Sequence, residues 1–140
     1  MRWRAIDSDR VRAAIEAAER TTSGEIVVSV SRFFWGNVER AARRAFERIG
    51  VANTKQHNGV LLFVVPARRR FVVLGDAGIH DKVGQAFWDT TAAAIRERFR
   101  ARDFTGGLVR GVEVIGSQLA SYFPPTADDV NELPDAPDFA

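Results

Sequence analysis

The chain has 140 residues, 46% of them hydrophobic and 27% charged, which is the balance of a folded protein with one modest core. It has no cysteine, which excludes disulfides, thiolate metal sites and cysteine nucleophiles. The formal charge is +2, but the five acids after residue 126 have no base among them, so the rest of the chain carries +7.

The sequence contains no membrane signal. No apolar run approaches the roughly 18 residues that a membrane span needs, and the N-terminal segment MRWRAIDSDR lacks the apolar core of a signal peptide. We therefore expect a soluble, cytoplasmic protein without a membrane span. The basic residues are spread over several segments and no nucleic-acid-binding motif is present, so we expect no nucleic-acid partner. A monomer is expected, and an unknown protein partner remains open.

The first half of the chain predicts two helices around a strand. Residues 7–20 repeat apolar side chains with the spacing of one helical face, and Asp7 or Ser8 can cap this helix. EIVVSVS, 25–31, is rich in β-branched residues and predicts a strand. A second helix is predicted for 37–50, because its first residue is an asparagine cap and its last a glycine.

The second half predicts two strands and then two helices. GVLLFVV, 59–65, is apolar throughout, as in a strand that is buried on both faces. The turn PARRR leads to a third strand, 71–75. A third helix is predicted for 81–100, and Thr105 is the expected cap of a fourth helix.

The last residues differ in composition from the rest. Residues 125–140 are acidic, contain several prolines and show no periodicity. We expect a domain over 1–124 followed by an extended or disordered tail over 125–140.

This order of elements predicts an α/β fold with a small mixed sheet, a βαββ core, between helices. The first two strands are joined through a helix and should be parallel, with a right-handed crossover. The third follows a short turn and should be antiparallel to the second. The end of the third strand then lies beside the starts of the first two.

We call this region the polar end of the sheet, because polar side chains from distant segments are expected to meet there. They are Ser23, Glu25, Asn53, Thr54, His57, Asn58, Asp76, His80 and Asp81.

The oxygen-bearing side chains at the polar end are of the types that calcium and magnesium bind. Glu25, Asn58, Asp76 and Asp81 are the candidate metal ligands, with Ser23, His57 and His80 as neighbours. The sequence thus predicts a Ca²⁺ or Mg²⁺ site and no organic cofactor. Paired carboxylates can also activate water, but no catalytic residue can be assigned.

Structural roles compete with this interpretation. Asp81 can simply cap the third helix, and Asp76 can close a turn after its strand. Glu25 can pair with a surface arginine. His57 and His80 are the only histidines, too few for a three-histidine zinc site, and both suit turns or the surface.

Two further features stand outside the polar end. The aromatic run Phe33, Phe34 and Trp35 is either a docking patch for a partner or a loop folded back onto the core. The arginines of the PARRR turn are either solvated or contact an anion.

The motifs TSGEIVVSV, HNGVLLFVVPARRRFVVLGDAGIHDKVG and FTGGLVRGVEVIGSQLASYFP, together with Trp88, resemble the TPM domain, also called the TLP18.3/Psb32/MOLO-1 family. The resemblance runs from about residue 8 to 124. Within the family, the chain is similar to the short, soluble bacterial members. It implies a Rossmann-like α/β sandwich. The family's recurring acidic and amide positions fall on Glu25, Asn58, Asp76 and Asp81.

The resemblance implies three kinds of function. Bacterial members that bind calcium or other divalent ions favour a cation-binding domain. A plant member with acid phosphatase activity gives the alternative of a metal-assisted phosphatase, weak if present. Nematode members that modulate receptors give the alternative of a protein-interaction or accessory module.

Overall fold

The structure, a computed structural model of the chain, describes residues 6–125 and 133–139. Its elements are, in chain order, α1 (Ser8–Glu19), β1 (Glu25–Val30), α2 (Val38–Ile49), η2 (Val51–Asn53), β2 (Gly59–Val65), η3 (Pro66–Arg68), β3 (Arg70–Gly75), α3 (Ala77–His80), α4 (Gln85–Arg100), α5 (Phe104–Tyr122) and β4 (Asp138–Phe139). The predicted α/β fold is confirmed.

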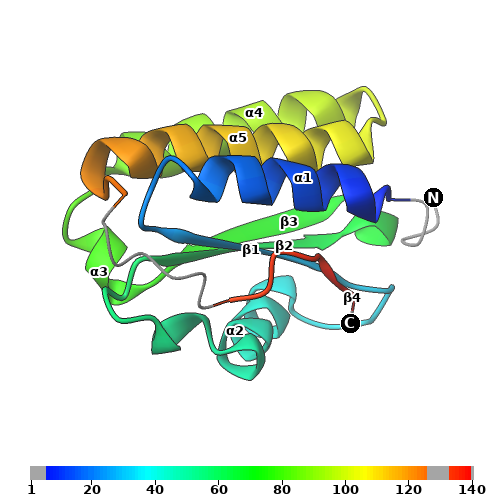
Figure 1. The fold of residues 1–140 in the computed structure, drawn as a ribbon. Helices are drawn as coiled ribbons and strands as arrows, with labels where there is room; N and C mark the ends of the chain where they lie inside the picture. The colour runs from blue at the N-terminus through cyan, green and yellow to red at the C-terminus, as the bar shows by residue number, and fades with distance from the viewer. Residues whose placement is uncertain (1–5, 126–132, 140) are drawn as a thin grey trace.

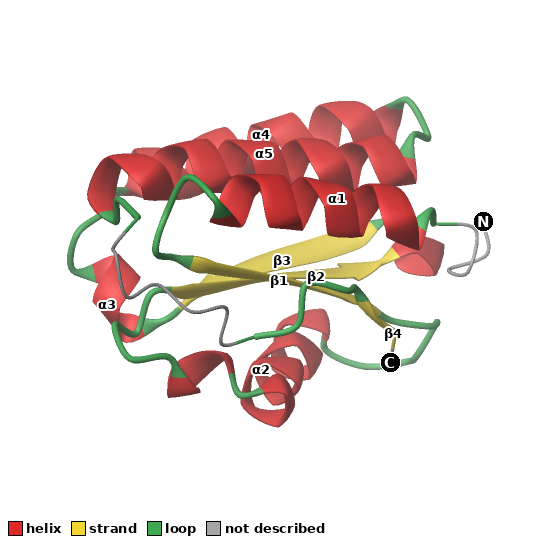
Figure 2. Ribbon diagram, in the orientation of Figure 1, coloured by secondary structure: helices red, strands yellow, loops and turns green. Residues whose placement is uncertain are grey.

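The sheet has four strands in the order β3-β2-β1-β4. β1 and β2 are parallel, with Glu25 opposite Gly59, and β2 and β3 are antiparallel, with Val60 opposite Gly75. Figure 1 shows α1, α4 and α5 on one face of this sheet and α2 on the other. The same three layers are clear when the ribbon is coloured by secondary structure (Figure 2).

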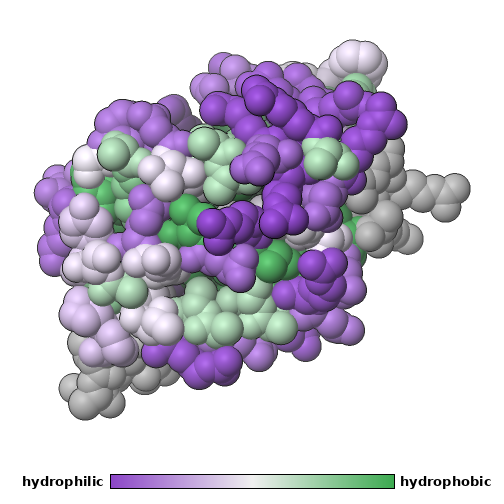
Figure 3. All heavy atoms as spheres, turned by 90° about the horizontal axis from the view of Figure 1, so that it is seen from above, coloured by the Kyte–Doolittle hydropathy of each residue, from purple (hydrophilic) through white to green (hydrophobic). Residues whose placement is uncertain are grey.

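Alternation along the strands divides the core into two clusters. In β2, Leu62 faces the cluster that contains α1, α4 and α5, while Leu61 faces the smaller cluster built on α2, and neither side chain is exposed to solvent. An apolar strand with both faces covered is the arrangement expected for a parallel pair. Seen from above, the outer surface of the helical layer is mainly hydrophilic, with hydrophobic residues exposed in small patches among the hydrophilic ones (Figure 3).

The predicted third helix is wrong in its first part. Asp81 does not begin it: α3 ends at His80 with Asp81 as its C-terminal cap, and α4 begins only after Gly84. The extended backbone of Gly84 separates the two helices. At the next helix, Asp103 rather than Thr105 is the cap, since its Oδ1 accepts a hydrogen bond of 2.9 Å from Gly106 N.

The C-terminal segment is partly attached to the sheet. Residues 126–132 lie outside the described residues, whereas β4 pairs in parallel with Ser29 and Val30 of β1, and Leu133 is buried in the α2 cluster. The division into a domain over 1–124 and a tail stays a prediction.

No helix within the described ranges is both long and apolar enough to cross a membrane.

Candidate functional site

The polar end of the sheet forms as the topology predicts. Gly75, the last residue of β3, lies opposite Val60 near the start of β2, and Gly59 lies opposite Glu25 at the start of β1. Asp76 N donates a hydrogen bond of 2.9 Å to Gly59 O, which ties the residue after β3 to the first residue of β2. Residues 25, 58 and 76 are therefore held close to one another by backbone pairing.

Asp76 is the best-defined carboxylate at this end. It is only 9% exposed and is the N-terminal cap of α3, where its Oδ1 accepts a hydrogen bond of 2.8 Å from Ala77 N. Its Oδ2 lies 3.2 Å from Nδ1 of His57, whose side chain is largely exposed. The carboxylate is thus fixed on one side by the backbone and reached on the other by a histidine at the surface.

Further buried polar groups belong to the segments that meet at the polar end of the sheet. Asn58 and Ser23 are both buried, and Asn58 Nδ2 donates a long hydrogen bond of 3.5 Å to Ser23 Oγ. Thr54 is also buried, and its Oγ1 has no hydrogen-bond partner in the described part of the chain. A buried hydroxyl without a partner costs free energy, so this oxygen is available to a ligand.

The main-chain carbonyl oxygens of Gln56 and His57 lie close to Gly78 of α3. A methyl group at Gly78 would lie 2.5 Å from the carbonyl oxygens of both Gln56 and His57. His57 itself has a φ of 50°, the left-handed conformation that non-glycine residues rarely adopt. The 54–58 turn is therefore pressed against α3, with its carbonyl oxygens directed at that short helix.

Glu25 belongs to a second group of carboxyls. It is 3% exposed, and its side chain bonds to that of Glu19 at the end of α1, which also bonds to Asp135. Glu19 Oε2 accepts a hydrogen bond of 3.0 Å from Ile26 N. Burial, followed by the bonds to Asp135 and Glu25, raises the pKa of Glu19 to about 10, so this group keeps its proton at neutral pH.

Asp81 and His80 lie on the exposed side of α3. The His80 ring packs against Trp88, with ring centres 5.4 Å apart, and lines a cavity of about 300 Å³ together with Gly75 and Arg43. Among the described residues, His80 meets Asp76 only through the backbone hydrogen bond of 3.4 Å that His80 N donates to Asp76 O. Asp81 makes no hydrogen bond with Asp76. Across the described ranges, no group of three or more His, Asp or Glu side chains has an arrangement that could hold a metal ion.

Five of the seven predicted candidates fall into three groups at this end of the sheet: Asp76 with His57, Asn58 with Ser23, and Glu25 with Glu19 and Asp135. Asp81 and His80 belong to none of these groups. Reasoning from the sequence missed Glu19 and Asp135. Glu19 had a signal, since it stands in the last turn of a helix that ends just before β1. Asp135 had none, because its segment reads as a polar tail.

The aromatic loop after β1 is the other exposed feature that the sequence singled out. Trp35 is 89% exposed and Phe33 49%, and their rings meet edge to face with centres 4.8 Å apart. Phe34 instead packs against the α2 cluster, and Arg68 Nη1 donates hydrogen bonds to the carbonyls of Phe34 and Gly36. One aromatic residue of the three is folded back and two are presented to solvent.

The chain is similar to several known structures. The NMR structure of BA42 protein from the psychrophilic bacterium Bizionia argentinensis is 39% identical, with a TM-score of 0.90 over 96% of this chain and 95% of that chain. The N-terminal domain of a P. gingivalis protein is 22% identical, with a TM-score of 0.63 over 82% and 72% of the two chains.

A third structure, the N-terminal domain of cg2496 from Corynebacterium glutamicum, is 19% identical, with a TM-score of 0.64 over 84% of this chain and 74% of that chain. These last two likenesses show the fold alone. Comparison with curated protein sequences gives no significant match. The family model of the TPM domain matches residues 5–118. The chain belongs to the TPM domain family.

Proposed function

We propose that this TPM domain binds a divalent cation, calcium or magnesium, at the polar end of the sheet. The observation that supports the proposal is the presence of buried oxygen donors, Asp76 among them, at this end of the sheet. One nearly buried carboxylate lies in the same region as the amide of Asn58 and the Thr54 hydroxyl, which has no partner among the described residues.

These donors fit a hard cation. Calcium accepts carboxylate, amide, hydroxyl and main-chain carbonyl oxygens in flexible geometry, and magnesium keeps several waters and needs few protein ligands. Because three carboxylates do not converge here, an ion would combine Asp76 with Asn58, Thr54, main-chain carbonyls of the 54–58 turn and water. Glu25 and Asp81 are the further candidate ligands, which would contact the ion directly or through water.

The bound ion would link the 54–58 turn to the end of β3. An ion that binds the folded state alone raises the free energy of unfolding in proportion to the logarithm of its concentration above the Kd. The His57 ring would compete with the ion for the Asp76 carboxylate, because its Nδ1 lies 3.2 Å from Oδ2 while Oδ1 is already held by Ala77 N.

The test is a ¹H–¹⁵N NMR titration with calcium and then with magnesium. We expect saturable shifts that are confined to residues near 25, 54–58 and 76–81. Asp76→Asn should abolish them, and since asparagine is as good an N-terminal cap as aspartate, α3 should stay folded. Loss of the shifts in Asp81→Asn as well would place Asp81 among the ligands.

Asp89→Asn is the matched control, because Asp89 is an exposed carboxylate on α4 that bonds to Gln85. It should leave the titration unchanged. Absence of shifts at millimolar ion, or shifts that survive Asp76→Asn, would contradict the proposal.

A second candidate function, protein interaction, is favoured by the exposure of the loop after β1. Trp35 is 89% exposed on a loop whose backbone is held by Arg68, and large exposed aromatic side chains are typical of interaction sites. A pulldown from lysate should retain a partner with the native chain and lose it with Trp35→Ala. Tyr122→Ala, which removes another exposed aromatic ring far along the chain, is the control.

A further inference from the structure

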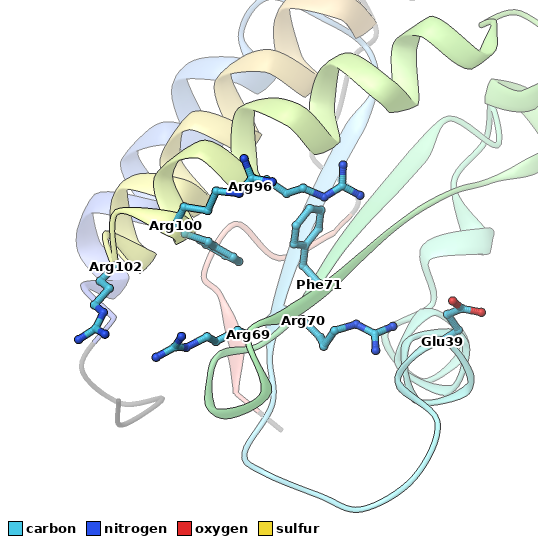
Figure 4. A pocket seen from close by; sticks show the side chains of 8 residues that line it. Glu39, Arg69, Arg70, Phe71, Arg96, Arg100 and Arg102 are labelled. Carbon is cyan, nitrogen blue, oxygen red and sulfur yellow. The ribbon is translucent and has the colours of Figure 1, made fainter.

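A second hollow lies at the other end of β3, away from the polar end. It has a volume of about 560 Å³, within the range of small-molecule sites. Its lining residues are Glu39, Arg69, Arg70, Phe71, Arg96, Phe99, Arg100 and Arg102. Figure 4 shows the side chains arriving from the start of β3, from α4 and from the turn after α4. We call it the arginine pocket.

The charge of the arginine pocket is not balanced. Five arginines stand against one glutamate, which gives the lining a net charge of +4. Within the described ranges, none of the five guanidinium groups forms a hydrogen bond or ion pair with another side chain. Five like charges around one hollow repel one another, and an anion placed among them would relieve that repulsion.

The backbone fixes two of these arginines in uncommon conformations. Arg69 has a φ of 52° and Arg102 a φ of 61°, in the left-handed region that side chains with a Cβ rarely adopt. Arg69 N donates a hydrogen bond of 3.0 Å to Pro66 O, and Arg102 N donates one of 3.0 Å to Phe99 O. Both positions would suit glycine or asparagine, yet both present a guanidinium group to the pocket; strain of this kind is often found at functional sites.

The floor of the arginine pocket is aromatic and firmly packed. Phe71 meets Phe99 edge to face with ring centres 5.6 Å apart, and the Arg96 guanidinium lies over the Phe71 ring at 5.8 Å. Phe99 is buried in the main core. Around Phe71, Arg70 points toward Glu39 while Arg69 points to the other side, toward Arg102 (Figure 4). The positive groups therefore flank a fixed ring on two sides.

We propose that the arginine pocket binds an oligophosphate, that is, a compact anion with two or more linked phosphate groups. Guanidinium groups present paired N–H donors that match phosphate oxygens. Several charges on both sides of one ring suit a multiply charged ligand better than a single orthophosphate. The arginines surround one hollow rather than following a groove, which suits a small molecule rather than a nucleic-acid strand.

This pocket is independent of the cation site. The two lie at opposite ends of the six residues of β3, roughly 17 Å apart by the rise of a strand. Oligophosphate binding therefore does not depend on the proposed function, and either proposal can fail alone.

The test is isothermal titration calorimetry of the full chain in metal-free buffer with sodium tripolyphosphate, adenosine triphosphate and orthophosphate. We expect saturable binding of tripolyphosphate that is at least about tenfold tighter than that of orthophosphate, and that weakens as sodium chloride is raised. If adenosine triphosphate binds more tightly than tripolyphosphate, the ligand is a nucleotide. If the two bind equally, the pocket recognises the linked phosphates alone.

The main variant is Arg69→Asn with Arg102→Asn. Asparagine tolerates the left-handed backbone, so the fold should persist while two guanidinium groups are lost. Tripolyphosphate affinity should fall at least about tenfold, as expected for lost charge-assisted bonds. Arg96→Gln with Arg100→Gln should have the same effect from the exposed face of α4.

The matched control is Arg12→Gln with Arg20→Gln, which removes the same charge from an exposed position on α1 and from its exposed C-terminal cap, neither of which lines the pocket. It should change the affinity less than about twofold, since only long-range charge is lost. If the control variant loses as much tripolyphosphate affinity as the pocket variants do, the proposal is overturned in favour of general charge attraction. Absence of saturable tripolyphosphate binding at millimolar concentration would overturn it too. So would duplex DNA that binds more tightly than tripolyphosphate and depends on Arg69 and Arg102.

Discussion

The fold strongly alters the ionisation of Glu19. Its carboxyl lies between Ile26 N, which donates to it at 3.0 Å, and the side chains of Glu25 and Asp135. Burial and the neighbouring carboxyl groups both disfavour the charged form of Glu19. Glu19 therefore keeps its proton at neutral pH and can donate a hydrogen bond from its carboxyl group.

Stability should therefore fall as the pH rises. The pKa of Glu19 is raised from 4.5 to about 10, so between these values the unfolded chain binds fewer protons than the folded protein does. The stabilising contribution is complete below pH 4.5 and is lost progressively toward pH 10. The loss is at most about 1.4 kcal/mol per pH unit, and the partial exposure of Glu19 makes it smaller.

Glu19→Gln should remove this dependence, because glutamine resembles the protonated carboxyl and does not titrate. Urea unfolding at pH 6, 7.5 and 9 should give a flatter curve for this variant than for the native chain, and a higher free energy of unfolding at pH 9. Glu16→Gln, one turn earlier on α1 and exposed, should retain the native slope. A native slope in Glu19→Gln as well would mean that another group binds the proton.

At the residue scale, the sequence predicted the kinds of role that a side chain can take better than the contacts that it makes. Asp76 was open to two interpretations, and it is in fact an N-terminal cap whose second oxygen meets His57. Asp81 had the residue type of a cap but stands at the wrong end of α3. Residue type predicts that an aspartate suits a helix end, while the choice between two aspartates five positions apart depends on the packing of the whole turn.

At the element scale, β4 depends on polar contacts more than on strand pairing. Only two residues pair with β1. Asp138 accepts hydrogen bonds from Arg48 at 3.1 and 2.6 Å and from Ser29 Oγ at 2.8 Å. The hydrogen bonds of Arg48 lower the pKa of Asp138 from 3.8, so this contribution is present above pH 3.8 and is lost only as the pH falls below it.

The Arg48–Asp138 pair should show a measurable coupling. A double-mutant cycle with Arg48→Gln and Asp138→Asn, measured by urea unfolding at pH 7, should give a coupling of about 0.5–1 kcal/mol, because the pair is bidentate but partly solvent-exposed. The same cycle with Arg44→Gln, one turn earlier on α2, should give a coupling near zero. Equal couplings for the two arginines would indicate general electrostatics rather than a specific pair.

The sequence could predict the long elements but not the small ones. The runs that form β1, β2 and β3 are apolar and rich in β-branched residues, and the longer helices repeat apolar side chains at helical spacing. The existence and order of these elements are confirmed. The break between α3 and α4 depends on one extended glycine, and β4 depends on long-range contacts with Arg48 and Ser29. Neither leaves a periodic pattern in its own segment.

At the scale of the whole molecule, topology was the most predictable property. A short turn between two apolar runs requires an antiparallel pair, and a helix between two strands requires a crossover. These two rules alone brought Glu25, Asn58 and Asp76 to one end of the sheet. The division of that end into separate groups of contacts depends on side-chain direction and on residues around 135, which topology does not specify.

The strand order has a consequence for how copies of this chain meet one another. β3 is the outermost strand on one side, and no other strand in the described ranges pairs with its outer edge. An apolar strand of this kind, FVVLG, is a template for self-association unless charge repels a second copy. The arginines around its start provide that repulsion, so a polyanion that neutralises them should bring the protein nearer to aggregation in concentrated solution.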